Sequence, residues 1–222
     1  MGAYELLLLA HLLLFAYWLG GDVGVFYSSG FVVDGSRSRE ARLMAGKIML
    51  ACDLIPRICM SLMLTVGGLL AATLGFDHPA WQTVAIVLLA PVWFGMVMTL
   101  HFAHGASWVP ALTRIDYAFR WLVIAAILAS CAYALATGRL AGAPWLIAKL
   151  LGFAFLVFCG LMIRRKIPGF IAGYVKLVSD DPSAEENAAM QRSLGQVRPW
   201  VIAIWVVLVV EAAIGIAKPG AG

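Results

Sequence analysis

The sequence predicts an all-α fold, a six-helix transmembrane bundle with both termini outside. Hydrophobic residues make up 63% of the 222-residue chain and charged residues only 13%, which leaves too little polar surface to cover a soluble globule. Six segments are apolar over the roughly 20 residues that a helix needs to cross a hydrocarbon core. The sequence lacks the alternating pattern of a membrane barrel, so helices are expected to satisfy the backbone in lipid.

The six predicted spans cover residues 5–26, 44–75, 80–103, 115–137, 144–163 and 199–217. The first is interpreted as a span and not as a signal peptide, because Glu5 stands where a basic region belongs and no small-residue cleavage site follows. Short connections at 74–80 and 137–144 predict that the spans on either side of them pack as antiparallel neighbours. Residues 1–222 therefore form a single integral membrane domain.

Prolines and glycines within the spans predict local features of the helices. Pro56 and Pro91 each remove a backbone donor and are expected to kink the second and third helices. Gly20, Gly21 and Gly24 give the first helix a small-residue surface that a second helix can approach closely.

The longest connection, residues 164–198, is expected to form a cytoplasmic loop with a short surface helix at about 182–194. Asp181 is suited to cap that helix and Pro182 to occupy its first position, while Gly195 is expected to end it.

The distribution of the 16 Lys and Arg residues predicts the orientation. Those outside the spans or near the inner ends of spans gather around three connections: Arg37, Arg39, Arg42 and Lys47; Arg114 and Arg120; and Arg164, Arg165, Lys166, Lys176, Arg192 and Arg198. The opposite side holds little more than Arg139 and Lys218. The positive-inside rule therefore places both termini outside and the basic connections in the cytoplasm, as in a multi-pass protein of the inner (plasma) membrane. The net charge of +4 suits a lipid bilayer as partner, and no nucleic-acid partner is expected.

Motif analysis excludes several classes of protein. The four cysteines lie within spans without CxxC or CxxCH spacing, so they are interpreted as buried packing residues. There is no nucleotide-binding loop, nucleophile elbow, zinc-protease signature or kinase motif. Hydrolase and ATPase functions are therefore not expected.

The candidate functional residues are ionisable side chains inside apolar spans, where a charge costs on the order of 2.5–3.5 kcal/mol on insertion scales. They are His11, Asp22, Asp53, Arg57, Lys149 and Glu211. Such residues usually face a partner, a cofactor or water inside a bundle.

Helical spacing predicts how these residues group. His11, Trp18 and Asp22 are separated by seven and four residues, so they lie on one stripe of the first helix. Asp53 and Arg57 are four residues apart, as in an ion pair beside Pro56. Asp22, Asp53 and Arg57 are the candidates for moving protons, and a structural salt bridge is the alternative for the Asp53–Arg57 pair.

Depth predicts a second group. His11, Lys149 and Glu211 each lie about 10 Å from the outer end of their helices, at 1.5 Å per residue, so they are expected to share a layer near the outer face. His101 and His104 lie at the inner end of the third span. Because His11 and His101 are at opposite depths, a bis-histidine haem is not expected.

The segment MVMTLHFAHG raises the question of copper, because thioether and imidazole groups suit Cu(I). The metal candidates are therefore His101 and His104, with Met98 nearby, and also His11. Met96 points away from the two histidines, and methionine is a common packing residue in membrane helices.

The first helix, AHLLLFAYWLGGDVGVFYS, and the fifth-span entry PWLIAKL resemble the membrane protoporphyrinogen oxidase family of bacteria and the related copper-resistance D-type membrane domain. The positions that carry the resemblance are His11, Trp18, Gly20, Pro144, Trp145 and Lys149. It implies a haem b site with His11 as ligand and Lys149 as partner of an anionic porphyrin carboxylate. Trp18 and Glu211 are further candidates for contact with the cofactor.

Three functions follow as hypotheses. The first is a haem-associated membrane redox protein, in its most concrete form one that oxidises a tetrapyrrole. The second is a transporter for a metal ion such as copper or for a small solute. The third is a structural subunit of a larger membrane complex, with a homo-oligomer or a membrane redox partner as its neighbour.

Overall fold

The computed structural model describes residues 1–103 and 105–220, and this part of the chain is all-helical. Its helices are α1 (Ala3–Val32), α2 (Arg39–Thr73), α3 (Ala80–Phe102), α4 (Val109–Thr137), α5 (Pro144–Lys166), α6 (Pro168–Ser179) and α7 (Ala184–Ala217). All except α6 are long and apolar enough to cross a membrane. The prediction of a six-helix transmembrane bundle is confirmed, and the chain is a multi-pass membrane protein.

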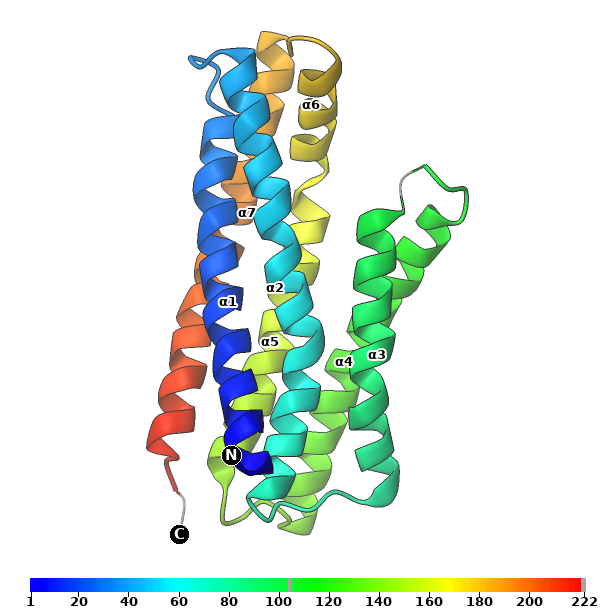
Figure 1. Ribbon diagram of the computed structural model, residues 1–222, viewed down its shortest axis with the longest axis vertical. Coiled ribbons are helices and arrows are strands. Elements are labelled where there is room, and N and C mark those ends of the chain that lie inside the picture. Colours follow the sequence, from blue (N-terminus) through cyan, green and yellow to red (C-terminus); the bar gives the residue numbers. More distant parts are fainter. Residues whose placement is uncertain (104, 221–222) are drawn as a thin grey trace.

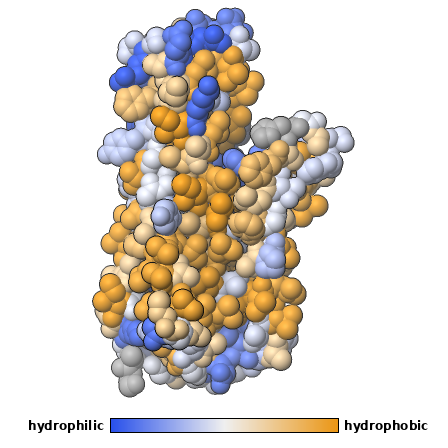
Figure 2. Space-filling model, in the orientation of Figure 1, coloured by the Kyte–Doolittle hydropathy of each residue, from blue (hydrophilic) through white to orange (hydrophobic). Residues whose placement is uncertain are grey.

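The long helices run along a common axis, with both termini at one end of the molecule (Figure 1). Helix α2 packs against α1 and α3, and α5 packs against α4 and α7. The α3–α4 pair leans away from the other helices toward the end that is distant from the termini. Hydrophobic side chains cover most of the shaft, while hydrophilic ones gather at the end opposite the termini (Figure 2). By the positive-inside rule, that hydrophilic end is expected to face the cytoplasm, and it is called the cytoplasmic end below.

Helices α1 and α2 approach closely because α1 presents glycines to α2. A Cβ atom at Gly21 would lie 2.7 Å from Cδ of Pro56, and one at Gly24 would lie 2.9 Å from Sγ of Cys52. A Cβ at Gly20, in contrast, would have open space around it. The predicted small-residue surface therefore consists of Gly21 and Gly24, and the inclusion of Gly20 was wrong because one residue turns 100° around the helix.

The main hydrophobic core is built on aromatic side chains from three helices. The ring of Phe153 on α5 makes edge contacts with Trp18 on α1 and with Trp93 on α3, at centroid distances of 6.3 and 6.5 Å. Trp93 is fully buried and Trp18 nearly so. Edge-to-face geometry suits the quadrupoles of aromatic rings, so these contacts hold α1, α3 and α5 together at one level.

Helices α1, α2 and α7 extend together beyond the length that a membrane requires. At 1.5 Å per residue the 35 residues of α2 extend about 52 Å, against a hydrocarbon core of about 30 Å. The excess forms a cytoplasmic extension, made of the end of α1, the start of α2, α6 and the start of α7. It has its own core, consisting of Val32, Val33, Ala45, Met49, Phe170, Leu177, Met190 and Leu194.

The connection 164–198 differs from the sequence-based expectation in two ways. An additional helix, α6, buries Phe170, Gly173 and Leu177 at helical spacing. The expected helix at 182–194 is not separate, because α7 continues from it through Gly195 and Pro199 into the last span. The predicted break was wrong because buried residues anchor α7 on both sides of it: Leu194 belongs to the core of the extension, and Ile204 and Leu208 belong to the main hydrophobic core.

The start of α7 also differs in its capping residue. Ser183, and not Asp181, is the N-cap: its hydroxyl accepts from the Glu186 backbone, and the Glu186 carboxylate accepts from the Ser183 backbone. This is a capping box, which satisfies two backbone donors at once. Pro182 lies just before the helix.

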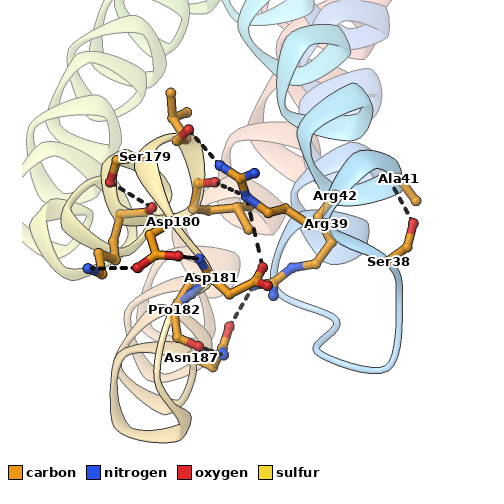
Figure 3. Close-up of polar contacts among 12 residues, drawn as sticks. Ser38, Arg39, Ala41, Arg42, Ser179, Asp180, Asp181, Pro182 and Asn187 are labelled. Atoms are coloured by element: carbon orange, nitrogen blue, oxygen red, sulfur yellow. Dashed lines mark hydrogen bonds and ion pairs between the residues drawn. The ribbon is translucent and has the colours of Figure 1, made fainter.

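Two arginines at the start of α2 connect the helices of the cytoplasmic extension (Figure 3). Arg39 donates to the carbonyls of Leu177 and Val178 at the end of α6, at 3.0 and 2.8 Å. Arg42 is buried and donates to the carbonyl of Val32 at the end of α1, at 2.8 Å, and to Oδ1 of Asn187 on α7, at 2.6 Å. A positive charge at a helix C-terminus also interacts favourably with the helix dipole.

We expect Arg42→Gln to destabilise the cytoplasmic extension, because it removes charged donors from a buried carbonyl and a buried amide. The loss should be about 1.5–3 kcal/mol in the free energy of unfolding, the range for hydrogen bonds to charged groups. Denaturant unfolding in detergent measures it, and hydrogen exchange should rise at the end of α1. Lys47→Gln, at an exposed position on the same helix, is the control. Equal losses in the two variants would contradict this role of Arg42.

Candidate intramembrane polar site

The outer polar layer begins with an ion pair between α5 and α7. Nζ of Lys149 lies 3.4 Å from Oε2 of Glu211 and donates to the backbone carbonyl of Glu211 at 2.7 Å. Glycines make room for it: a Cβ atom at Gly152 would collide with the Glu211 carboxylate, and one at Gly215 would lie 3.4 Å from Nζ of Lys149. The pair is thus seated against the backbone of both helices.

His11 on α1 belongs to the same layer. Its ring lies against α2, where a Cβ atom at Gly67 would be 3.2 Å from Cε1. The Lys149 ammonium is close enough to act electrostatically on the ring. Nδ1 of His11 is buried and has no hydrogen-bond partner among the described residues. The structure therefore brings together the three residues that the depth argument grouped, and it leaves one imidazole nitrogen uncommitted.

A second layer lies further toward the cytoplasmic end, between α1 and α2. The Trp18 side chain is a hydrogen-bond partner of the Asp22 carboxylate, and Asp53 is near enough to act on Asp22 by charge. Asp53 and Arg57 form the ion pair that their spacing predicts. Oδ2 of Asp22 is buried and lacks a partner in the part of the chain that the structure describes.

A third cluster consists of residues that sequence reasoning did not select: Asp116 and Arg120, which are almost fully buried, and the half-buried Arg164. The Asp116 carboxylate is fully buried and its Oδ2 accepts from Nε of Arg120 at 3.1 Å and from Nη1 of Arg164 at 2.6 Å. Arg120 lies over the Trp93 ring at 5.4 Å from its centroid, and its Nη1 is 3.5 Å from Sδ of Met60. This cluster joins α4 to α5, α3 and α2.

The sequence contained a signal for this cluster. Asp116 and Arg120 are four residues apart within the predicted span 115–137, the same spacing that identified Asp53 and Arg57. Arg120 and Arg164 were instead assigned to the basic connections because they lie near span ends. The burial of Arg120 and the ion pair of Arg164 with the buried Asp116 show that part of the basic charge near the cytoplasmic end belongs to the interior.

The second layer and the Asp116 cluster are connected through α2. Arg57 is near enough to act on Arg120 by charge, and Met60, one turn along α2, contacts Arg120. Carboxylates and guanidiniums are equal in number across this band, three of each: Asp22, Asp53 and Asp116; Arg57, Arg120 and Arg164. Equal numbers of opposite charges limit the cost of burial.

The predicted metal site at the inner end of α3 is not assembled in the described residues. The ring of His101 makes an edge contact with Phe102, its neighbour in the chain, at 4.9 Å, and His104 lies outside the described residues. Within residues 1–103 and 105–220 there is no group of three His, Cys, Asp or Glu side chains that could hold a metal ion. His11 lies in the outer layer, away from this end.

Two open, shallow grooves lie on the described surface, and neither is lined by the outer-layer residues. One, of about 420 Å³, is apolar and lies between α1 and α2, lined by residues such as Leu13, Tyr17 and Ile58. The other, of about 250 Å³, lies between α1 and α7 near Arg198. The outer layer is thus packed between helices and has no wide opening among these grooves.

The fold and these clusters define a class: a multi-pass helical membrane protein with charged side chains paired in its interior. Comparison of the chain with protein-family models, with curated proteins and with solved structures gives no match. The functional argument therefore depends on the geometry of the polar layers and on the motifs quoted above.

We expect Asp116→Asn to destabilise the bundle strongly, because it leaves the buried guanidinium of Arg120 and the half-buried one of Arg164 without their counter-ion. Removing one partner of a buried ion pair typically costs 3–5 kcal/mol. Thermal unfolding in detergent measures the loss, with Arg114→Ala, an exposed position on the same helix, as control. A variant as stable as the Arg114 control would refute a central role for Asp116.

Proposed function

We propose that this chain is a redox protein of the inner membrane, in which His11 binds the redox group and the Asp22–Asp53–Arg57 layer handles protons. The observation that carries the proposal is the buried, unpartnered Nδ1 of His11 beside an ammonium group. Ionisable groups at membrane depth mark functional pathways more often than they serve packing alone.

Haem b is the group that the resemblance implies, and the donor set agrees with a haem that has one protein ligand. An imidazole nitrogen is a common axial ligand, and in His11 that atom is not used by any hydrogen bond among the described residues. The His11 ring itself occupies the space that Gly67 leaves on α2, so a haem at this position would need the ring to turn away from α2. When bound, haem would supply one-electron chemistry.

Lys149 and Glu211 are proposed to adjust to the charge of the bound group. Lys149 is neutralised by Glu211, and an anionic carboxylate of a tetrapyrrole would compete for the same ammonium. Glu211 would then need a proton or water in place of Lys149. The layer is thus suited to link binding of an anionic group to uptake of a proton.

Asp22 is proposed to hold a proton for the redox site. It lies on the same helix as His11, about 16 Å away at 1.5 Å per residue, and its Oδ2 is unpartnered in the described part of the chain. Asp53 and Arg57 form a charge-balanced pair beside it. Electron transfer in a low-dielectric interior is favoured when a proton moves with the electron, because charge is costly there.

A spectrum tests the proposal. Purified protein, as isolated or after addition of haem, should show a Soret band, and His11→Ala should lower haem occupancy about tenfold because the ligand nitrogen is removed. His101→Ala, the same change at the cytoplasmic end of a different helix, α3, is the matched control. No Soret band in the folded wild-type protein, or an equal loss in both variants, would refute the haem assignment.

The proposed role of Lys149 is tested by comparison with Lys218, a second cation at the same end of the molecule. If it pairs with a carboxylate of the cofactor, Lys149→Met should weaken haem retention about fivefold, and Lys218→Met should not. The measurement is the rate of haem transfer to an excess of apomyoglobin. Thermal stability of each variant distinguishes loss of retention from loss of fold.

A second candidate function is proton-coupled transport of a small solute, and the band of three carboxylates and three guanidiniums favours it. Such balanced interior charges are typical of ion and proton pathways in transporters. Proteoliposomes containing a pH-sensitive dye would then show proton movement that Asp22→Asn abolishes and Glu5→Gln, on the same helix, does not. Haem binding without such movement would eliminate this candidate.

A further inference from the structure

An open groove of about 250 Å³ lies between α1 and α7 and is called the Arg198 groove. It is lined by Phe26, Tyr27, Gly30, Phe31, Asp34, Arg37 and Arg198. None of these residues belongs to the polar layers described above.

Arg198 brings a positive charge into the groove without an anionic partner. Its guanidinium lies over the Phe26 ring, 5.0 Å from the centroid. Nη2 rests against the α1 backbone, where a Cβ atom at Gly30 would be only 3.1 Å away. Nε is buried and unpartnered among the described residues, and no ion pair to Arg198 occurs among them.

The second guanidinium of the groove is already neutralised. Arg37 lies over the Phe31 ring at 4.4 Å and pairs with Asp34 at 2.9 Å. Hydrogen bonds from Ser36 and Arg37 lower the pKa of the Asp34 carboxyl, so it is ionised at neutral pH. The groove therefore carries one net positive charge, contributed by Arg198.

The depth of the groove identifies the kind of anion. Phe26 ends the first predicted span and Arg198 directly precedes the last one, so the groove lies where the apolar segments meet the polar connections. Tyr27 and Phe31 are 65% and 44% exposed, and exposed aromatic rings at this level are typical of the membrane interface. We propose that the Arg198 groove binds the phosphate of an anionic phospholipid from the cytoplasmic leaflet.

The test uses the full chain in neutral detergent. Native mass spectrometry measures binding of dioleoyl phosphatidylglycerol and, separately, of dioleoyl phosphatidylcholine. Arg198→Gln should weaken phosphatidylglycerol binding about fivefold, the factor that corresponds to about 1 kcal/mol per basic residue, and should leave phosphatidylcholine binding unchanged. Arg192→Gln, an exposed position on the same helix, is the matched control.

A second variant tests the sign of the charge. Asp34→Asn removes the carboxylate of the groove and should strengthen phosphatidylglycerol binding, because the net charge rises from one to two. Unchanged binding in Arg198→Gln, an equal loss in Arg192→Gln, or weaker binding in Asp34→Asn would overturn the proposal. Displacement of the lipid by an equimolar amount of soluble glycerol phosphate would also overturn it, since the ligand would then be a free phosphate.

Discussion

The arrangement of the bundle depends on one constraint, that a charge in hydrocarbon must meet an opposite charge or a hydrogen-bond partner. The Asp116 carboxylate satisfies this constraint with two partners, Arg120 on its own helix and Arg164 on α5. An ion pair within one helix would leave that helix free to rotate or slide. Because Arg164 comes from a second helix and Arg120 contacts Met60 on a third, the cluster sets the relative position of α2, α4 and α5. Apolar packing alone would define the relative position of these helices less strongly, because lipid tails are as apolar as leucine.

The same constraint explains which parts of the fold were predictable from sequence. The spans were predictable because a long run of apolar residues has one stable environment, and the observed helices contain nearly all of the predicted segments. The cytoplasmic extension was not, because α6 and the continuation of α7 are stabilised by contacts with distant segments, such as Phe170 and Met190 in a shared core. Gly195 and Pro199 oppose a helix locally, but tertiary packing outweighs that preference.

The candidate site was predictable where depth and spacing were sufficient. His11, Lys149 and Glu211 lie about 10 Å inside their spans on the side with few other charges, so their burial could be inferred one residue at a time. Asp116 and Arg164 lie near the ends of their spans, where a charged residue is as easily in the headgroup region as in the interior. Only the direction of each side chain around its helix separates these two cases, and α4 gives little periodic signal because lipid and core are both apolar.

The arginines show that the number of charges near a span end predicts orientation, whereas the position of each charge determines what its side chain contacts. Arg42 caps a helix end, Arg120 completes a buried pair, and Arg198 lies over an aromatic ring at the edge of the span. All three contributed equally to the predicted orientation, although Arg42 and Arg120 are almost entirely buried. The orientation does not depend on them, because exposed residues such as Arg114, Arg165 and Lys166 still outnumber Arg139 and Lys218. A planar guanidinium with five donors suits all three environments, so the basic residues of a membrane protein determine topology and, at selected positions, also hold the interior together.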